Sequence, residues 1–241
     1  MATLEATLER PVHRAAALLR HPLENGDVLT APEFLRRYEA MPEVKKAELI
    51  EGVVYMGSPV RLRRHAKPDN LMQGILCNFA AETPGCEAIS NATTILDLEN
   101  VPQPDAALRL LEDRGGQSLL NAEDYLEGAP ELVVEIAGST AAKDLHAKKR
   151  AYRRAGVREY LVWVTGEPAL LVFRRGKGDF AAAPADADGV WRSREFPGLW
   201  IEVPALLEQR SGTVLKTLQC GLAAREHAAF VRALRRRRAA A

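Results

Sequence analysis

The feature that most constrains the fold is a short, almost unbroken apolar run at residues 132–136, Leu-Val-Val-Glu-Ile. A run of this length and composition predicts a strand that is buried on both faces, as in the central strands of α/β sheets. Glu135 lies within it, and a buried carboxylate is costly unless it is paired or bound to a metal. Near the carboxyl end of the strand, it would open onto the crevice where α/β folds bind ligands. The alternative is an ordinary strand-end glutamate at the surface.

Segments with strand and helix patterns alternate along the rest of the chain, which predicts an α/β domain with a mixed β-sheet flanked by helices. Thr30 and Glu33 have capping-box spacing, and Ser139 or Thr140 is expected to cap a later helix. Strands are predicted at residues 47–56 (bent at Gly52), 89–98, 105–110, 132–136, 159–164, 169–174 and around Trp191. Helices are predicted at residues 30–41, 68–84, 139–155 and after 204.

Composition narrows the class of protein. The chain has 241 residues, enough for one well-cored domain with extensions, and its net charge of +1 provides no global basic field. Its three cysteines are scattered and its five histidines lack metal-ligand spacing, which argues against a disulfide framework and a zinc site. No signal peptide or membrane-spanning run is visible, so we expect a soluble, cytoplasmic protein that does not bind membranes. We divide it into an N-terminal arm (1–28), one domain (29–203) and a helical C-terminal extension (204–241).

A second carboxylate and a lysine accompany Glu135. Asp105 follows Pro104 and precedes Glu135 by 30 residues, enough for two strands to lie side by side. Pro-Asp alone is common turn chemistry. Asp144, Lys148 and Tyr152 recur every four residues, so they share one helix face. In one interpretation, this helix face directs Lys148 toward the carboxylates and Asp144 holds its ammonium group. In the other, Asp144 and Lys148 form an ordinary surface ion pair, which would stabilise the helix by about 0.3–0.5 kcal/mol.

Further charged residues extend this set. Glu48 and Glu51 flank Leu-Ile before Gly52, and one of them, with Glu48 favoured, would supply a third carboxylate to a cation. As isolated residues they would more often face solvent. Two basic segments are suited to phosphate contacts, although solvated surfaces are the commoner explanation; they are Lys149, Arg150, Arg153 and Arg154 on the helix, and the loop 61–67 with His65.

Two carboxylates on neighbouring strands with a lysine behind them are what a magnesium-dependent phosphodiester hydrolase needs. Carboxylate oxygens are the ligands that Mg²⁺ prefers. The cation and the lysine then stabilise the attacking water and the charge on the phosphate. The residues therefore predict a nuclease-like site.

Five motifs in order resemble the Uma-two family, a bacterial group related to restriction endonucleases within the PD-(D/E)XK nuclease superfamily. The resemblance spans about residues 30 to 200. It rests on Glu48-Leu-Ile-Glu51-Gly, Pro104-Asp105, Val133-Val-Glu135-Ile, Asp144-x-x-x-Lys148-x-x-x-Tyr152 and Gly156-Val-Arg-Glu-Tyr160. It implies a restriction-endonuclease-like core and a metal site built by Asp105 and Glu135. Two departures stand out: the usual strand lysine is replaced by Ala137, so Lys148 from the helix takes its role, and Gly138-Ser-Thr replaces a longer Ser-Pro-Ser-Thr turn.

The first hypothesis is thus a DNA endonuclease or nickase. Asp105, Glu135 and Glu48 would hold Mg²⁺, with Mn²⁺ as a substitute, and Lys148 would complete the catalytic set. The alternative is a non-catalytic regulatory protein that uses the same fold to bind nucleic acid or a protein partner. The sequence gives little support to a small-molecule hydrolase, because it contains neither a Gly-x-Ser-x-Gly elbow nor a Cys/His signature. A homodimer through the segment after Pro204 is a further expectation.

Overall fold

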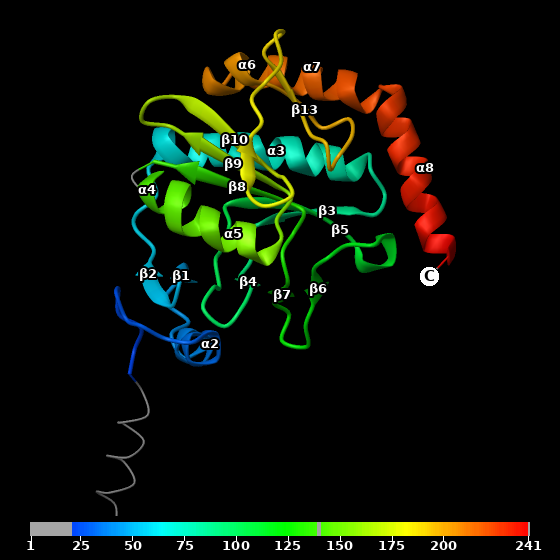
Figure 1. Ribbon diagram of the computed structural model, residues 1–241. Helices are drawn as coiled ribbons and strands as arrows, with labels where there is room; N and C mark the ends of the chain where they lie inside the picture. Colours follow the sequence, from blue (N-terminus) through cyan, green and yellow to red (C-terminus); the bar gives the residue numbers. More distant parts are fainter. Residues whose placement is uncertain (1–20, 139–140, 241) are drawn as a thin grey trace, which may run out of the picture.

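The computed structural model describes residues 21–138 and 141–240. Most of the predicted N-terminal arm and both candidate helix caps, Ser139 and Thr140, therefore lie outside the described residues. A six-stranded mixed sheet forms the centre of the fold, in the order β11-β10-β9-β8-β5-β3 (Figure 1). β8 and β9 are parallel and their other neighbours are antiparallel. The strands are β3 (Cys86–Ser90), β5 (Ala106–Leu110), β8 (Leu132–Ala137), β9 (Glu159–Val164), β10 (Ala169–Arg175) and β11 (Phe180–Ala182).

Helices lie on both faces of this sheet (Figure 1). One face packs against α3 (Lys67–Ala81), α6 (Val203–Leu207) and α7 (Ser211–Leu222), with the final helix α8 (Arg225–Ala240) beside the short helix η2 (Glu112–Arg114). The opposite face is covered by a continuous helical segment that follows β8. It consists of α4 (Ala141–Lys143), the π-helical turn η3 (Asp144–Lys148) and α5 (Lys149–Ala155). The predicted α/β class with a helix-flanked mixed sheet is confirmed.

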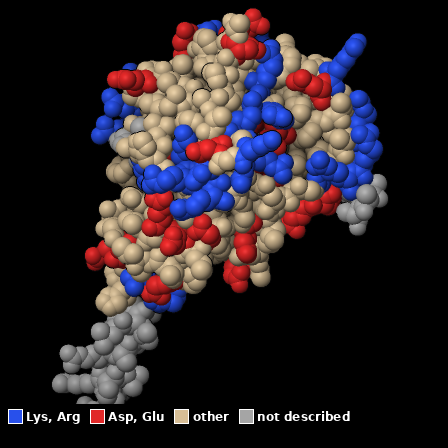
Figure 2. Space-filling model, viewed as in Figure 1, with Lys and Arg blue, Asp and Glu red and all other residues tan. Residues whose placement is uncertain are grey.

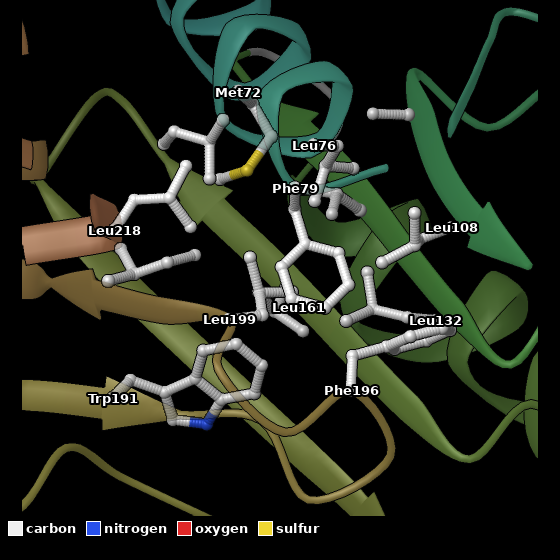
Figure 3. Close-up of a cluster of buried hydrophobic side chains, with 14 of the residues drawn as sticks. Met72, Leu76, Phe79, Leu108, Leu132, Leu161, Trp191, Phe196, Leu199 and Leu218 are labelled. Atoms are coloured by element: carbon white, nitrogen blue, oxygen red, sulfur yellow. The ribbon is translucent and has the colours of Figure 1, made fainter. Parts of the chain in front are cut away.

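Alternation along β8 divides its side chains between the two faces. Leu132, Val134 and Ile136 belong to the large apolar core (Figure 3). This core also contains residues of α3 and α7, together with Trp191 and Phe196. Val133 and Ala137 belong to the smaller core on the other face. Glu135 lies between these two in sequence, so the strand's period of two directs it under the helical segment η3–α5.

Smaller elements surround the main sheet. Helix α2 (Ala31–Glu39) packs on a hairpin of β1 (Ala47–Ile50) and β2 (Val53–Met56). Glu51 and Gly52 form its turn with positive φ values of 52° and 76°, a conformation typical of two-residue hairpin turns. The remaining elements are η1 (Leu62–Ala66), β4 (Thr94–Ile95), β6 (Leu119–Leu120), β7 (Leu126–Glu127), β12 (Val190–Arg192) and β13 (Trp200–Glu202).

Three local expectations differ from the structure. The side chain of Thr30 makes no capping hydrogen bond, and the carboxylate of Glu33 pairs with Arg36 and Arg37. The strand predicted at residues 89–98 is two strands, β3 and β4, which belong to different sheets. The helix predicted as one unit after β8 contains the π-helical turn η3. Within the described residues, no helix has the length and apolar character needed to cross a membrane.

Candidate active site

Asp105 and Glu135 are brought together by antiparallel pairing of their strands. Asp105 immediately precedes β5, where Ala106 pairs with Val134 of β8. The backbone amide of Ile136 donates a hydrogen bond to Asp105 Oδ2 at 2.8 Å. Both carboxylates are buried, with 3% of Asp105 and 2% of Glu135 exposed. The prediction that their strands lie side by side is therefore correct.

Lys148 reaches this pair from the helical segment on the same face. Its Nζ lies 2.7 Å from Glu135 Oε1 and 2.6 Å from Glu48 Oε1, and only 2% of the residue is exposed. The Asp144 carboxylate is farther away, at 3.9 Å from the ammonium group. The shortest contacts of Lys148 are thus to the two glutamates rather than to Asp144. Tyr152 donates its hydroxyl hydrogen to Glu135 Oε1 at 2.7 Å.

The two glutamates of the first hairpin point to different places. Glu48 is buried and faces the site, where its Oε2 accepts a hydrogen bond from Lys143 Nζ at 2.7 Å. Its Oε1 also accepts the backbone amide of Gln103 at 3.0 Å. Glu51 lies on the hairpin turn and pairs outside the site with Arg150, at 2.7 Å.

Three basic residues belong to the site although sequence reasoning did not assign them to it. Lys46 Nζ lies 2.8 Å from Asp105 Oδ1, and Lys143 contacts Glu48. His65 Nε2 lies 3.3 Å from Asp105 Oδ2, so a residue of the predicted phosphate-contacting loop reaches the carboxylate itself. A signal for Lys46 existed, because it precedes Glu48 by two residues in extended chain and the two share a face. The positions of Lys143 and His65 depend on tertiary packing.

The charges of the site hold two of its carboxyl groups in the ionised form. Burial acts to raise the pKa of Glu48, but the charges of Lys148, Lys143 and Lys46 outweigh it and lower that pKa to about 2. Burial acts on Asp105 in the same direction. The hydrogen bond from His65 and the charge of Lys46 outweigh it and hold the pKa of Asp105 well below its usual value.

Glu135 behaves differently. Burial is the largest cause that raises its pKa to about 8; the charge of Lys148 opposes this shift, and the charge of Asp105 adds to it. Burial lowers the pKa of Lys148, yet Glu135 and Glu48 raise it well above its usual value. The ammonium group therefore keeps its proton, whereas Glu135 is a carboxyl group that can take up a proton near neutral pH.

The donor set suits a hard divalent cation with few protein ligands. In the described parts of the chain, no three His, Cys, Asp or Glu side chains converge in a way that would enclose a metal ion. Mg²⁺ is usually held by one or two carboxylates, with water and substrate phosphate oxygens completing its octahedron. Asp105 and Glu135 supply such a pair at adjacent strands, and the charge of Asp105 contributes to the raised pKa of Glu135. These residues fit a two-carboxylate Mg²⁺ site.

Comparisons with known proteins agree with this fold. Among solved structures, the chain is similar to a protein from Anabaena variabilis described as "a putative nuclease belonging to DUF820". The TM-score is 0.52 at 13% sequence identity, over 79% of this chain and 99% of that one. At this identity the similarity shows the fold alone. A search of curated proteins gives no significant match.

A family comparison extends over most of the chain. Residues 31–204 match the Uma2 family, which is described as "Putative restriction endonuclease". These residues include β1, β5, β8 and the η3–α5 segment, and hence every residue of the site described above. The chain belongs to the Uma2 family of nucleases related to restriction endonucleases.

Proposed function

We propose that this chain is a magnesium-dependent endonuclease that hydrolyses phosphodiester bonds of DNA. The observation that carries the proposal is the convergence of Asp105, Glu135 and Lys148 in one buried cluster of charges. Burial on this scale is costly for charged groups that serve stability alone. Membership of a nuclease family supports the reaction class.

Asp105 and Glu135 are the proposed metal ligands. When bound, a divalent cation would polarise the phosphodiester and favour ionisation of the attacking water. Asp105 is suited to this role because it remains ionised. Burial raises the pKa of Glu135, so this carboxyl group would give up its proton when the cation binds, because a nearby positive charge favours the carboxylate form. The assignment of Glu48 as a third ligand stays a prediction. Its contacts support a role in holding Lys148 and Lys143.

The basic residues would bind and orient the phosphate. Lys148 is fixed by two glutamates and remains charged, so it would stabilise negative charge that develops on the reacting phosphate. Lys46 and His65 are more accessible, with 32% and 26% of their side chains exposed, and would contact the substrate as it enters. Ala137 occupies the strand position at which the superfamily usually carries its lysine. Lys148, 13 residues after Glu135, supplies an ammonium group beside that glutamate.

A non-catalytic protein that binds nucleic acid or a protein partner is the second candidate. One observation favours it, namely that lysines of the chain already contact all three carboxyl groups: Lys46 pairs with Asp105, and Lys148 with Glu48 and Glu135. A network of this kind can also fix a fold without chemistry.

Cleavage of supercoiled plasmid DNA distinguishes the two candidates. The wild type is expected to nick the plasmid with Mg²⁺ and not with a chelator, and Glu135→Gln is expected to abolish nicking. Glu131→Gln is the matched control, because Glu131 is also buried and immediately precedes β8 but bonds to backbone amides outside the site. Circular dichroism checks that each variant is folded. Equal nicking by the wild type and Glu135→Gln would exclude the proposed site.

A further inference from the structure

We propose that a basic hollow at the end of α5 is a second phosphate-binding site, which holds the nucleic-acid backbone beyond the reacting phosphodiester. The hollow lies between the last turn of α5 and the turn that joins β10 to β11. This inference rests on the proposed nuclease function and assigns a substrate contact to residues outside the carboxylate cluster. The lining residues are Arg153, Arg154, Arg175, Gly176, Lys177, Gly178 and Asp179.

The hollow is built by contacts that fix its walls. Arg175 donates a hydrogen bond to the carbonyl oxygen of Arg153 at 3.1 Å, which ties the hairpin to the helix. Arg153 contacts the Gly178 carbonyl oxygen at 3.4 Å and the Asp179 carboxylate at 3.6 Å. The turn closes through the Gly176 amide and the Asp179 carbonyl oxygen, at 2.9 Å. The two segments therefore form one surface.

Charge at the hollow is strongly unbalanced. Four cations line it against the single carboxylate of Asp179, in a chain whose total net charge is only +1. Within the described residues, Lys177 has no hydrogen-bond or ion-pair partner, and Arg154 makes only a loose pair with Glu51 at 3.6 Å. Figure 2 shows Lys and Arg gathered over α5 and the neighbouring hairpin. Lys149 and Arg150 continue this basic surface along the helix toward Lys148.

The position of the hollow suits an extended polyanion. Arg153 and Arg154 follow Lys148 by five and six residues, which corresponds to about 8–9 Å along a helix axis. Each strand of duplex DNA carries one phosphate per roughly 3.4 Å of the helix axis, so a strand along α5 would present about two to three phosphates over this distance.

The chemistry of the lining favours phosphate over other ligands. Apart from its two glycines, every lining residue is charged, so the hollow has no apolar side chain to bind an amphipathic ligand. Three guanidinium groups offer the planar donor pairs that bind phosphate oxygens in bidentate fashion. The turn is also open, since a Cβ on Gly178 would have no atom within 4 Å.

The test compares two charge-matched double variants. Arg154→Ser with Lys177→Ser removes two cations from the hollow and leaves Arg150 paired with Glu51, at 2.7 Å. Lys216→Ser with Arg232→Ser removes two exposed cations from α7 and α8, away from α5. Binding of a fluorescent DNA duplex is measured by anisotropy with the metal chelated, between about 50 and 200 mM salt. The slope of the logarithm of the DNA association constant against the logarithm of the salt concentration is measured for each protein. Its magnitude is expected to fall by about 1 to 2 in the hollow variant only.

Three results would overturn the inference: equal slopes for the two variants, absence of duplex binding by the wild type, and displacement of DNA by polyglutamate at the same charge concentration. The plasmid assay separates this inference from the proposed function. If the hollow variant binds and cuts DNA like the wild type, the hollow is not a phosphate-binding site, whereas the nuclease site is retained. If neither the wild type nor the variants cut the plasmid but the slope changes as expected, the phosphate-binding role of the hollow is supported and the nuclease proposal is wrong.

Discussion

At the scale of single residues, Lys148 combines a positive charge with nearly complete burial, and its ammonium group contacts two buried glutamates. Such a cluster is tolerated only while every member keeps its partners. Tyr152 and the Gln103 amide complete the hydrogen bonds of the glutamates. The site is therefore both a candidate reaction centre and a determinant of stability.

Replacing Lys148 should have a far larger effect than replacing its neighbour. Lys148→Met leaves Glu48 and Glu135 without their shared cation and should lower the free energy of unfolding by about 3–5 kcal/mol. Lys149→Met removes a cation–π contact with Phe173, 3.6 Å from the ring centroid, and should cost about 0.5–1 kcal/mol. Urea denaturation measures both. Equal losses would show that the Lys148 cluster is not a connected unit.

The Glu48 carboxylate should make stability depend on acid. Its pKa falls from 4.5 to about 2 in the folded protein, so it stabilises the fold above pH 4.5, and this contribution is lost as the pH falls toward 2. The effect is on the order of 3 kcal/mol for a shift of this size. Glu48→Gln lacks it, so the stability difference between wild type and variant should shrink on acidification. Denaturation in the presence of a chelator tests this, and a difference that stays constant with pH would contradict it.

At the scale of elements, the strands and helices that follow simple periodicity could be predicted, and those that depend on packing could not. β8 and β9 form close to their predicted positions because their apolar runs suit a strand buried on both faces. The π-helical turn at Asp144–Lys148 has no local sequence signal. The choice between Glu48 and Glu51 also depended on the hairpin turn, which carries Glu51 to the surface.

The site shows the same division. Asp105, Glu135 and Lys148 could be found from strand position and helix spacing, and Lys46 from its alternation with Glu48. Lys143 and His65 could not be found in this way. Each contacts a carboxylate that is distant in the sequence, since Lys143 pairs with Glu48 and His65 with Asp105.

The packing of α7 on the β12–β13 loop can be tested by replacing glycine with alanine at two positions of α7, because the two replacements should change the stability in different ways. A Cβ on Gly221 would lie 2.2 Å from the Gly198 carbonyl oxygen, so Gly221→Ala must push the helix from the loop and should cost at least about 1–3 kcal/mol. Gly212 is on the same helix with no atom within 4 Å of such a Cβ. Gly212→Ala should be neutral or stabilising, by up to about 1 kcal/mol. Thermal unfolding measures both, and a shift of the same sign and size in both variants would contradict this packing.

At the scale of the whole molecule, the two faces of the main sheet have different tasks. One face carries the large core with α3 and α7 (Figure 3). The other carries the charged site under η3 and the basic surface of α5. A net charge of +1 conceals this separation, which is why composition alone did not reveal a basic surface. A homodimer through the residues after Pro204 stays a prediction, and α7 in that segment already packs on α3 and β13 of its own chain.

The most direct test of the central claim is calorimetric titration of Mn²⁺ into the wild type, Glu135→Gln, Asp105→Asn and the control Glu131→Gln. The account predicts one-site binding to the wild type and the control. Loss of either proposed ligand should weaken binding by more than about 100-fold, because changes outside the ligand shell alone typically cost 10–100-fold. Equal Mn²⁺ affinity in the wild type, Glu135→Gln and Asp105→Asn would contradict the assignment of the two carboxylates to a metal.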